Sequence, residues 1–536
     1  MSTLPSTQKA VALPAKRTPL IEITTPVQPP AAGEVVVHVQ WTAASPLDLH
    51  RSDGGLLISS YPALQGGGGA AGTIVAIGSG GDLKGLQVGD RVSAFAFHGD
   101  KEANQQEYIT IPAYLASKIP DGIPLQAAVT VPVNLVTVFH SVTADLELEL
   151  PWPIQQNWQP KAANKPILVW GASSSVGIFA IQVLRHWRYT NVLAVSSGSH
   201  HTYLKSLGAT ACFDYRKTDV VDKILDYLKD EDEPKAPYIL DCIGSLNGTL
   251  EPLAKIAQRG SRVAIMLPVI IKDATEDEEP VYEMEVSKCI PDKWAEGTIV
   301  RGVRTHFYLQ NEFFKERLQP EILPTLLAEG IVQPNNQRVV EGATLVERAQ
   351  NALNLLRSKA VSGEKLVYRV SEATPHHRYK EELYSMIWGC ITCHGPGDAS
   401  WIKGNMNADI YLIVVNDYVC QSWEWYGMDP KKTIFQQDNA SPHTADKGNE
   451  YFQQQRWTIL PWPANSPDLN PIEHVWAYVK RQLSLFEKVP ETLEALWERV
   501  QDIWINLPME FIDHLYESMP KRMAEVIRSK GGPTKY

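Results

Sequence analysis

The segment from Pro166 to Val183 constrains the fold of this chain more than any other. Its letters PILVW, GASSS and VGIFAIQV give a buried strand, a turn of small residues and an apolar helix in direct succession. Further strand and helix patterns alternate after it, among them NVLAVSS, HTYLKSLGA, YILDCIG and GSRVAIM. Alternating strands and helices predict a doubly wound parallel sheet, so we expect an α/β fold over residues 151–334.

The residues that precede this region have a different pattern. In residues 1–150, short β-branched runs such as EVVVHVQ, AGTIVAIG and DRVSAFAF are separated by Gly, Asp and Pro. That pattern predicts a compact β-rich barrel. Residues from about 335 to 371 contain a helical stretch and a last strand, KLVYRV, which we expect to complete the barrel.

The character of the sequence changes again after Ser371. Residues 372–380 are polar and contain a proline, which favours a linker. Nine of the fifteen tryptophans lie beyond it, in a region that we expect to form a separate domain over residues 381–536. A length of 536 residues is consistent with two or three domains.

Composition excludes several classes of protein. A chain that is 44% hydrophobic and 21% charged is typical of a globular protein, and its longest apolar runs are too short to cross a bilayer. The N-terminus lacks a basic start followed by an apolar stretch, and six scattered cysteines suggest no disulfide framework. We therefore expect a cytoplasmic protein with no membrane partner. A net charge of −11 argues against a large nucleic-acid surface.

The small-residue turn has the features of a dinucleotide site. Gly171 and Gly177 occupy the positions for a tight turn and for close helix packing, and Ala172, Ser174, Ser175 and Val176 complete the loop. The N–H groups at the start of the helix suit a pyrophosphate, and the two serines can add hydroxyl donors. The alternative is a turn that only caps the helix, but the strand–helix–strand context favours nucleotide binding.

The end of the next strand bears on the choice of cofactor. An NAD site usually places Asp or Glu there to bind the ribose hydroxyls, whereas this chain has AVSSGSHH. Ser196 and Ser197 can hydrogen-bond a 2′-phosphate, and no acid repels it. The sequence therefore predicts NADPH rather than NADH, although an ordinary polar turn remains the alternative for either serine.

These motifs, together with ASPLDLHRSDG, GAAGTIVAIGSG, LQVGDRV and LKSLGATACFDYRK, resemble the medium-chain dehydrogenase/reductase family over residues 8–371. The similar branches are fungal trans-enoyl reductases and quinone oxidoreductases. The resemblance implies a GroES-like barrel and a Rossmann domain. It also implies that Tyr215 contacts the adenosine phosphate, that Ile243 and Gly244 flank the nicotinamide ribose, and that Thr137, a candidate catalytic residue, lies on the segment that flanks the nicotinamide.

Zinc is not expected in this reductase. Where zinc-dependent members have their ligands, this chain has Ala44, Ser45 and the glycines 66–69, and no cysteine precedes Cys212. His50 and Asp48 are close in sequence, which favours a structural hydrogen-bonded pair.

Without zinc, hydride would pass from NADPH to an activated enone, an enoyl thioester or a quinone, and hydrogen bonds would stabilise the enolate. Tyr61, Thr137 and His140 are candidate proton donors by position alone. By analogy with the family, a polyketide synthase or a second copy of the chain would be the protein partner.

A second signature follows the linker. The run KKTIFQQD predicts a strand that ends at Asp438. QDNASPHTA and SPDLNPIEHVW contain Asp438 and Glu473 and resemble the RNase H-like catalytic domain of mariner-type (DDE) transposases. That chemistry needs three carboxylates around two Mg²⁺ ions. The strand with the first Asp is missing, and Glu381 and Glu382 begin a different strand.

Residues after 372 contain sixteen Lys and Arg against twenty-one Asp and Glu, which is unsuited to DNA. We therefore predict a partial, inactive α/β module with an exposed sheet edge, in which Asp438 and Glu473 are vestigial, and which would take Mg²⁺ only if it were active.

Cys390, Cys393 and His394 spell the haem-attachment pattern. Haem attachment requires export, for which the chain has no signal, so we expect no haem. Three hypotheses remain open: a reductase with an inert transposon-derived tail, a DNA-binding or DDE endonuclease-type protein that captured a reductase, and a gene-model fusion with no joint function.

Overall fold

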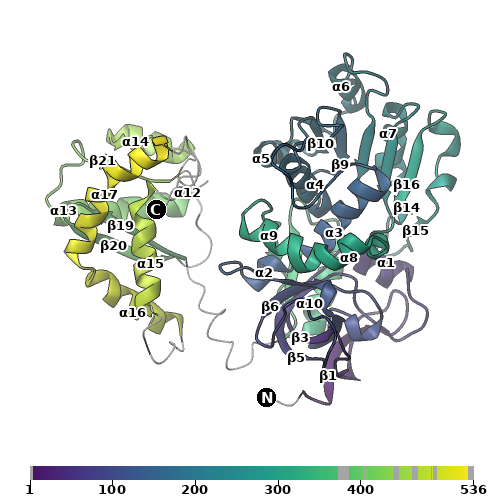
Figure 1. Ribbon diagram of the computed structural model, residues 1–536, viewed down its shortest axis with the longest axis horizontal. Helices are drawn as coiled ribbons and strands as arrows, with labels where there is room; N and C mark the ends of the chain where they lie inside the picture. The colour runs from purple at the N-terminus through teal and green to yellow at the C-terminus, as the bar shows by residue number, and fades with distance from the viewer. Residues whose placement is uncertain are drawn as a thin grey trace. The chain divides into compact units, whose positions relative to one another are not determined.

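The computed structural model describes residues 4–371, 386–402, 406, 408–438, 443, 446–461, 469–483, 486, 490 and 492–528. It divides into two compact units, Met1–Glu372 and Ala373–Tyr536 (Figure 1). The predicted linker at 372–380, with Glu381 and Glu382, lies outside the described residues. Each unit is therefore treated by itself.

Six parallel strands form the nucleotide-binding half of the first unit. Their order is β11-β10-β9-β12-β13-β16, which places the first strand of the sheet, β9, next to the fourth, β12. Ligands of such sheets bind where the chain reverses direction between these two strands. The strands are β9 (Ile167–Trp170), β10 (Val192–Ser196), β11 (Ala211–Asp214), β12 (Tyr238–Asp241), β13 (Arg262–Met266) and β16 (Ile299–Val303).

Helices cover both faces of this sheet because successive strand residues point to opposite sides. Ile167 and Val169 pack with α4 and α5, whereas Leu168 and Trp170 pack with α6 and α7. The apolar strand runs are buried on both faces, as a parallel sheet requires. The helices are α4 (Ser175–His186), α5 (His201–Leu207), α6 (Val220–Tyr227) and α7 (Glu251–Ile256).

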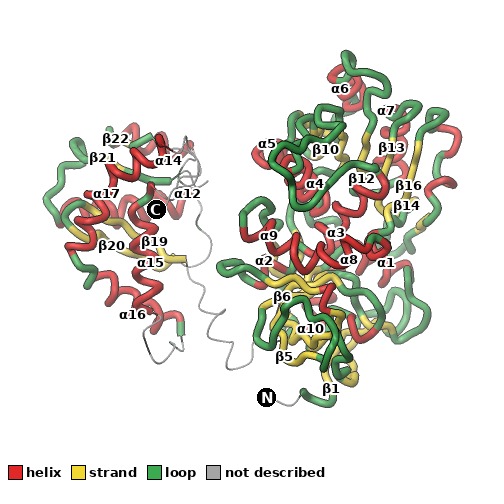
Figure 2. The backbone as a smooth tube through the Cα atoms, viewed as in Figure 1, coloured by secondary structure: helices red, strands yellow, loops and turns green. Residues whose placement is uncertain are grey.

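The other half of the first unit is a barrel of antiparallel strands, drawn in yellow in Figure 2. Its central strand β3 pairs with β5, β7 and β18, so the last strand of the unit joins a sheet begun near its N-terminus. The strands are β1 (Thr7–Leu13), β2 (Ile21–Pro26), β3 (Glu34–Ala43), β4 (Ala63–Leu64), β5 (Gly69–Ile77), β6 (Arg91–Phe95), β7 (Tyr108–Pro112), β8 (Ala116–Lys118), β17 (Gln337–Val339) and β18 (Lys365–Arg369).

Short helices pack around the barrel and between the two halves. They are α1 (Pro46–Gly54), α2 (Leu125–Ala128), α3 (Pro132–His140), α8 (Glu312–Arg317), α9 (Leu323–Ala328) and α10 (Leu345–Arg357). One helical segment that includes α2 and α3, Leu125–Asp145, is long and apolar enough to span a bilayer, but 83% of its most apolar window is buried inside the protein. A core helix accounts for that burial.

A hairpin leaves the parallel sheet between β13 and β16. It consists of β14 (Val269–Lys272) and β15 (Val281–Glu283), and the predicted apolar run RVAIMLPVII supplies both β13 and β14. The N–H of Ile270 donates to the carbonyl of Gly244 at 2.7 Å. The hairpin is thereby attached to the loop that follows β12.

The second unit contains two separate two-stranded sheets in its described part. β19 (Met386–Thr392) pairs with β20 (Gly395–Ile402), and β21 (Ile434–Phe435) pairs with β22 (Thr458–Ile459). The sequence predicted that the strand of β21 would end at Asp438. That prediction was wrong, because only two residues of β21 find ladder partners.

Helices enclose these sheets in two apolar clusters, one around Val475 and Trp504 and the other around Trp423 and Phe435. The helices are α12 (Ala408–Val414), α13 (Cys420–Trp425), α14 (Asp446–Gln455), α15 (Pro471–Leu483), α16 (Leu493–Ile505) and α17 (Met509–Arg528).

Candidate functional site

The turn between β9 and α4 lies at the point where the parallel sheet reverses. Gly171 has φ +75°, and an alanine Cβ there would lie 2.6 Å from Cγ1 of Ile243. A side chain is therefore excluded by both backbone and space. The N–H groups of Gly171 and Ala172 both donate to the Val195 carbonyl, at 3.0 and 2.9 Å, so they fix the turn and are not offered to a ligand.

The first turn of α4 provides the donors for an anion. The helix begins at Ser175, one residue before the expected start, with Ser174 as its N-cap. The Ser174 hydroxyl oxygen accepts from the N–H of Gly177 at 3.1 Å. The first N–H groups of a helix have no intrahelical acceptor, which leaves those of Ser175 and Val176 for a phosphate. Gly177 is required because a Cβ there would lie 2.6 Å from the Ala172 Cα.

The two serines that end β10 are almost completely buried, with exposures of 1% for Ser196 and 2% for Ser197. The Ser196 hydroxyl donates to the Ser197 carbonyl at 3.1 Å, and the Ser197 hydroxyl lies 3.1 Å from that of exposed Ser199. Their hydroxyls therefore already have partners within the loop.

A carboxylate that the sequence did not reveal stands beside this loop. Asp214 ends β11, which pairs in register with β10. The backbone N–H of Arg216 lowers the pKa of Asp214, and the N–H of Gly198 contributes as well. A carboxylate that accepts from backbone N–H groups therefore lies on the strand beside β10, and only the register of the sheet could have shown it.

An exposed tyrosine and an arginine follow that carboxylate in the chain. Tyr215 is 49% exposed, and the guanidinium of Arg216 lies 5.9 Å from the centre of its ring. The N–H of Tyr215 donates to the Ser196 carbonyl at 3.3 Å. This places Tyr215 and Arg216 next to the end of β10, where the adenosine ribose of a nucleotide on such a sheet would lie.

The loop after β12 is held by a buried acid. Asp241 is fully buried and accepts from the N–H groups of Ile243 at 2.9 Å and Gly244 at 3.1 Å. Burial raises the pKa of Asp241 to about 6, although these hydrogen bonds oppose the shift. The side chain of Ile243 is 41% exposed and covers Gly171. The structure therefore brings Gly171, Ile243 and Gly244 together across the reversal of the sheet.

The three candidate proton donors lie in different environments. Thr137, on α3, donates to the Val133 carbonyl at 2.7 Å and lies 3.0 Å from the hydroxyl of Thr305. Burial lowers the pKa of His140 to about 4. Tyr61 lies in the loop that follows α1 and is 41% exposed. A Cβ added to Gly55, the residue after α1, would lie 3.3 Å from the Tyr61 hydroxyl.

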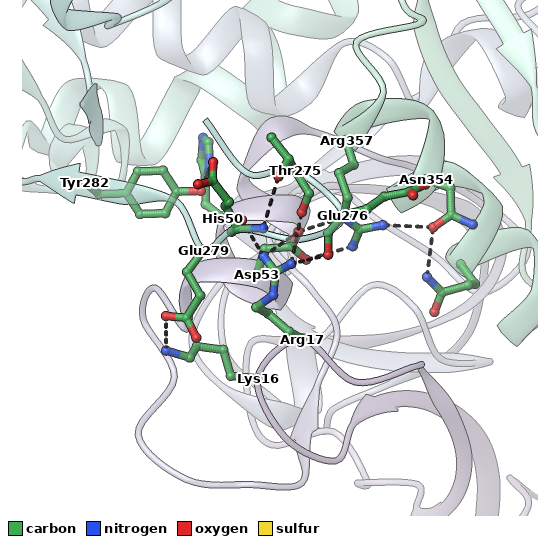
Figure 3. Close-up of polar contacts among 12 residues, drawn as sticks. Lys16, Arg17, His50, Asp53, Thr275, Glu276, Glu279, Tyr282, Asn354 and Arg357 are labelled. Atoms are coloured by element: carbon green, nitrogen blue, oxygen red, sulfur yellow. Dashed lines mark hydrogen bonds and ion pairs between the residues drawn. The ribbon is translucent and has the colours of Figure 1, made fainter. Parts of the chain in front are cut away.

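His50 has a partner that the sequence did not indicate. Its Nδ1 lies 2.7 Å from the hydroxyl of Tyr282, on β15, and not against Asp48 (Figure 3). Tyr282 pairs with Ile270, whose N–H holds Gly244. Burial lowers the pKa of His50 to about 4. The pair therefore links the barrel to the loop beside Ile243 and Gly244.

Asp48 belongs to a different set of contacts. Its carboxylate accepts from the Ser45 N–H at 2.7 Å, from the Ser45 hydroxyl at 3.1 Å and from Gln105 Nε2 at 3.0 Å. Burial raises the pKa of Asp48 and lowers that of nearby Lys365 to about 8. Across the described ranges, no group of three or more His, Cys, Asp or Glu residues is arranged to hold a metal ion.

The two carboxylates of the second unit lie together. Asp438 and Glu473 line one cavity of about 570 Å³, and burial followed by the charge of Asp438 raises the pKa of Glu473. Asp438 Oδ1 lies 2.6 Å from His443 Nδ1. The haem-type cysteines do not form a paired site, because Cys390 contacts the Asp398 carbonyl on β20 and the Ser422 hydroxyl on α13, whereas Cys393 is exposed.

Three family models match the chain. The alcohol dehydrogenase GroES-like domain matches residues 31–134, the zinc-binding dehydrogenase model 175–266 and the DDE superfamily endonuclease 367–497. The trans-enoyl reductase himH of Aspergillus japonicus is 30% identical over 355 residues, which are 63% of this chain and 90% of that protein. The chain joins a medium-chain dehydrogenase/reductase to a DDE transposase domain.

The predicted families and fold class are thereby confirmed, and the reductase unit has the fold of NAD(P)H-dependent oxidoreductases. The quinone oxidoreductase of Escherichia coli, solved with NADPH, covers 67% of this chain and 99% of its own, with a TM-score of 0.52 and 17% identity. That likeness concerns the fold alone.

The transposase unit is similar to the Tcb1 transposase of Caenorhabditis briggsae, with 34% identity over 151 residues. Those residues are 28% of this chain, and they span about half (54%) of that transposase's length.

Proposed function

We propose that the reductase unit uses NADPH, without zinc, to reduce a carbon–carbon double bond conjugated to a carbonyl, and that the substrate is an enoyl thioester. The observation that carries this proposal is the cofactor turn, where Gly171, the free N–H groups of Ser175 and Val176, and the loop of Ile243 and Gly244 meet. The likeness to himH, a trans-enoyl reductase, supports the substrate class.

The proposed reaction moves two electrons and one proton. Bound NADPH would supply the two electrons and one hydrogen as a hydride to the β-carbon of the enoyl group, and the resulting enolate would take a separate proton at its α-carbon. Ser175 and Val176 would hold the pyrophosphate, while Ile243 would pack beside the nicotinamide ribose. Thr137 and Thr305 would flank the ring.

Support for NADPH comes from charge. Arg216 stacks near Tyr215 and offers its guanidinium to a 2′-phosphate, while Asp214 is occupied by two backbone N–H groups. Ser196 and Ser197 would shape the loop, and the Ser197 hydroxyl would hydrogen-bond the 2′-phosphate.

The absence of zinc is supported by the contacts of Ser45. Ser45 and Asp48 are hydrogen-bonded to each other where zinc-dependent relatives have a ligand.

The remaining assignments follow from the same proposal. A polyketide synthase would deliver the enoyl group, a second copy of the chain would pair with the reductase, and the cytoplasm would supply NADPH.

We further propose that the transposase unit is catalytically inert, with Asp438 and Glu473 as remnants. The full-length chain should then show no nicking of supercoiled DNA with Mg²⁺ or Mn²⁺. Nicking that was lost in Asp438→Ala would contradict inertness.

The test of the proposed function is cofactor oxidation by the full-length chain. We expect crotonyl thioester to drive oxidation of NADPH at least ~10-fold faster than of NADH, and addition of a chelator to leave the rate unchanged. Arg216→Ala should raise the KM for NADPH and leave that for NADH unchanged. Lys223→Ala is the matched control, since Lys223 is exposed and pairs with Asp219. Binding of neither cofactor in a fluorescence titration would contradict the proposal.

A further inference from the structure

The transposase unit contains a chamber of about 570 Å³ that the reductase chemistry does not use. Two runs of consecutive residues line it. Seven consecutive residues, 387–393, line it from β19, and another seven, 432–438, line it from β21 and its flanks. The first run contains all of β19 except Met386, and the seven residues of β19 extend about 23 Å at 3.3 Å per residue. The second run contains the two residues of β21.

Each of those walls contains one strand of a two-stranded sheet, β19 in the first and the short β21 in the second. Within the described residues, β19 is paired with β20 only and β21 with β22 only, and no strand lies between β19 and β21. A sheet edge presents a row of N–H and C=O groups that can pair with another extended chain. The two edges border one chamber, so both are available to the same occupant.

Helices close the other two sides. Ile472 and Trp476 of α15, with Tyr516 of α17, lie on one side, and Tyr411 and Trp423 lie on the other. Ile472 and Trp476 pack against one of the two apolar clusters, and Tyr411 and Trp423 belong to the other. A strand in this position would therefore place alternate side chains into two apolar environments, which calls for apolar residues on both of its faces.

The ends of the chamber differ in charge. Asp438 and Glu473 lie at one end of the 432–438 wall, and Lys432 begins the other. Glu473 is partly buried beside the Asp438 carboxylate, and His443 Nδ1 lies 2.6 Å from Asp438 Oδ1. A cation entering at this end would offset the repulsion between the two carboxylates.

We propose that this chamber binds an extended segment of another protein as an added β-strand, with apolar side chains in its centre and a Lys or Arg beside Asp438 and Glu473. Main-chain pairing with β19 would give affinity, and the apolar clusters and the carboxylate pair would give specificity. A strand from a partner would also join the two small sheets into one, which would stabilise the unit by mass action.

The test uses the full-length chain and a fluorescein-labelled heptapeptide, Lys-Val-Ile-Val-Ile-Val-Thr, at sub-micromolar concentration. We expect saturable binding by anisotropy. Hydrogen exchange at residues 387–393 should slow by at least about ten-fold on binding. A peptide with proline at the central position lacks one N–H donor and should bind at least about ten-fold more weakly.

Charge is tested separately. Replacing the peptide lysine by glutamate should weaken binding at least about five-fold, and the variant Asp438→Asn/Glu473→Gln should lose that discrimination while NADPH oxidation stays at the parent rate. Equal binding of the proline peptide would overturn the proposal, because it would show adsorption through side chains alone. Absence of binding, or protection confined to residues outside 387–393 and 432–438, would overturn it as well.

Discussion

Arg357→Met tests whether a buried ion pair holds the reductase unit together. Arg357, at the end of α10, binds Asp53 of α1 through two hydrogen bonds, from Nε at 2.7 Å and from Nη2 at 2.8 Å (Figure 3). The Asp53 side chain is 1% exposed and that of Arg357 is 18% exposed. Methionine keeps most of the volume and removes the charge, so the substitution isolates the ion pair.

The magnitude follows from the carboxylate left behind. Removing one partner of a buried pair costs about 3–5 kcal/mol. Arg17 Nη1, which lies 3.9 Å from Asp53 Oδ2, would offset part of that cost. Arg17 also donates to the carbonyls of Thr275, Glu276 and Glu278 in the hairpin, so moving it toward Asp53 would weaken those bonds. We therefore expect a loss of about 2–4 kcal/mol in the unfolding free energy of this unit.

The assay must report on one unit, since a chain of two units need not unfold in a single step. Hydrogen exchange of peptides from β3 and β9 in increasing urea gives that local free energy. Asp53→Asn/Arg357→Met should lose less than Arg357→Met, because no charge is left buried. Arg338→Met is the control, since Arg338 pairs with Glu364 at the surface and should cost at most about 1 kcal/mol. A loss below about 0.5 kcal/mol for Arg357→Met would refute the reasoning.

Three further predictions concern other sites. Gly171→Ala should weaken NADPH binding at least about ten-fold in a fluorescence titration, because its Cβ would displace Ile243; unchanged affinity would contradict the site. The pKa of His140 is lowered to about 4, so the stability that neutral His140 contributes is present above pH 6.5 and lost as the pH falls toward 4. In urea titrations across that range, His140→Gln should flatten the fall in unfolding free energy. An unchanged profile would exclude His140 as its source. Exposed Cys393 should react with iodoacetamide at pH 8 well before Cys390, because burial raises the pKa of the Cys390 thiol to about 11. Mass spectrometry distinguishes the two labelled cysteines. Faster labelling of Cys390 would contradict its burial.

Local patterns in the sequence were enough to predict the parallel sheet and its cofactor turn. The run around Gly171 and Gly177 specifies a buried strand, a tight turn and a helix through neighbouring residues, and the structure has all three. The position of Asp214 beside the end of β10 depends on the register of two strands, which no local pattern contains.

Contacts between residues far apart in the chain could not be predicted from local sequence patterns for the same reason. His50 and Tyr282 are 232 residues apart, and Asp53 and Arg357 are 304 apart. Proximity in sequence suggested Asp48 as the partner of His50, whereas the fold turns Asp48 toward Ser45 and Gln105. The predicted strand up to Asp438 ended early, because propensity alone does not supply a neighbouring strand.

The place of β18 in the barrel sets an order of events during synthesis. This strand, Lys365–Arg369, pairs with β3, so the barrel sheet cannot be completed before residue 369 has been synthesised. The 167 residues from 370 to 536 then remain to be made, which takes about 10–30 s at the usual rate of translation. The reductase thus has time to fold before the transposase unit is finished, and the appended domain need not disturb its assembly.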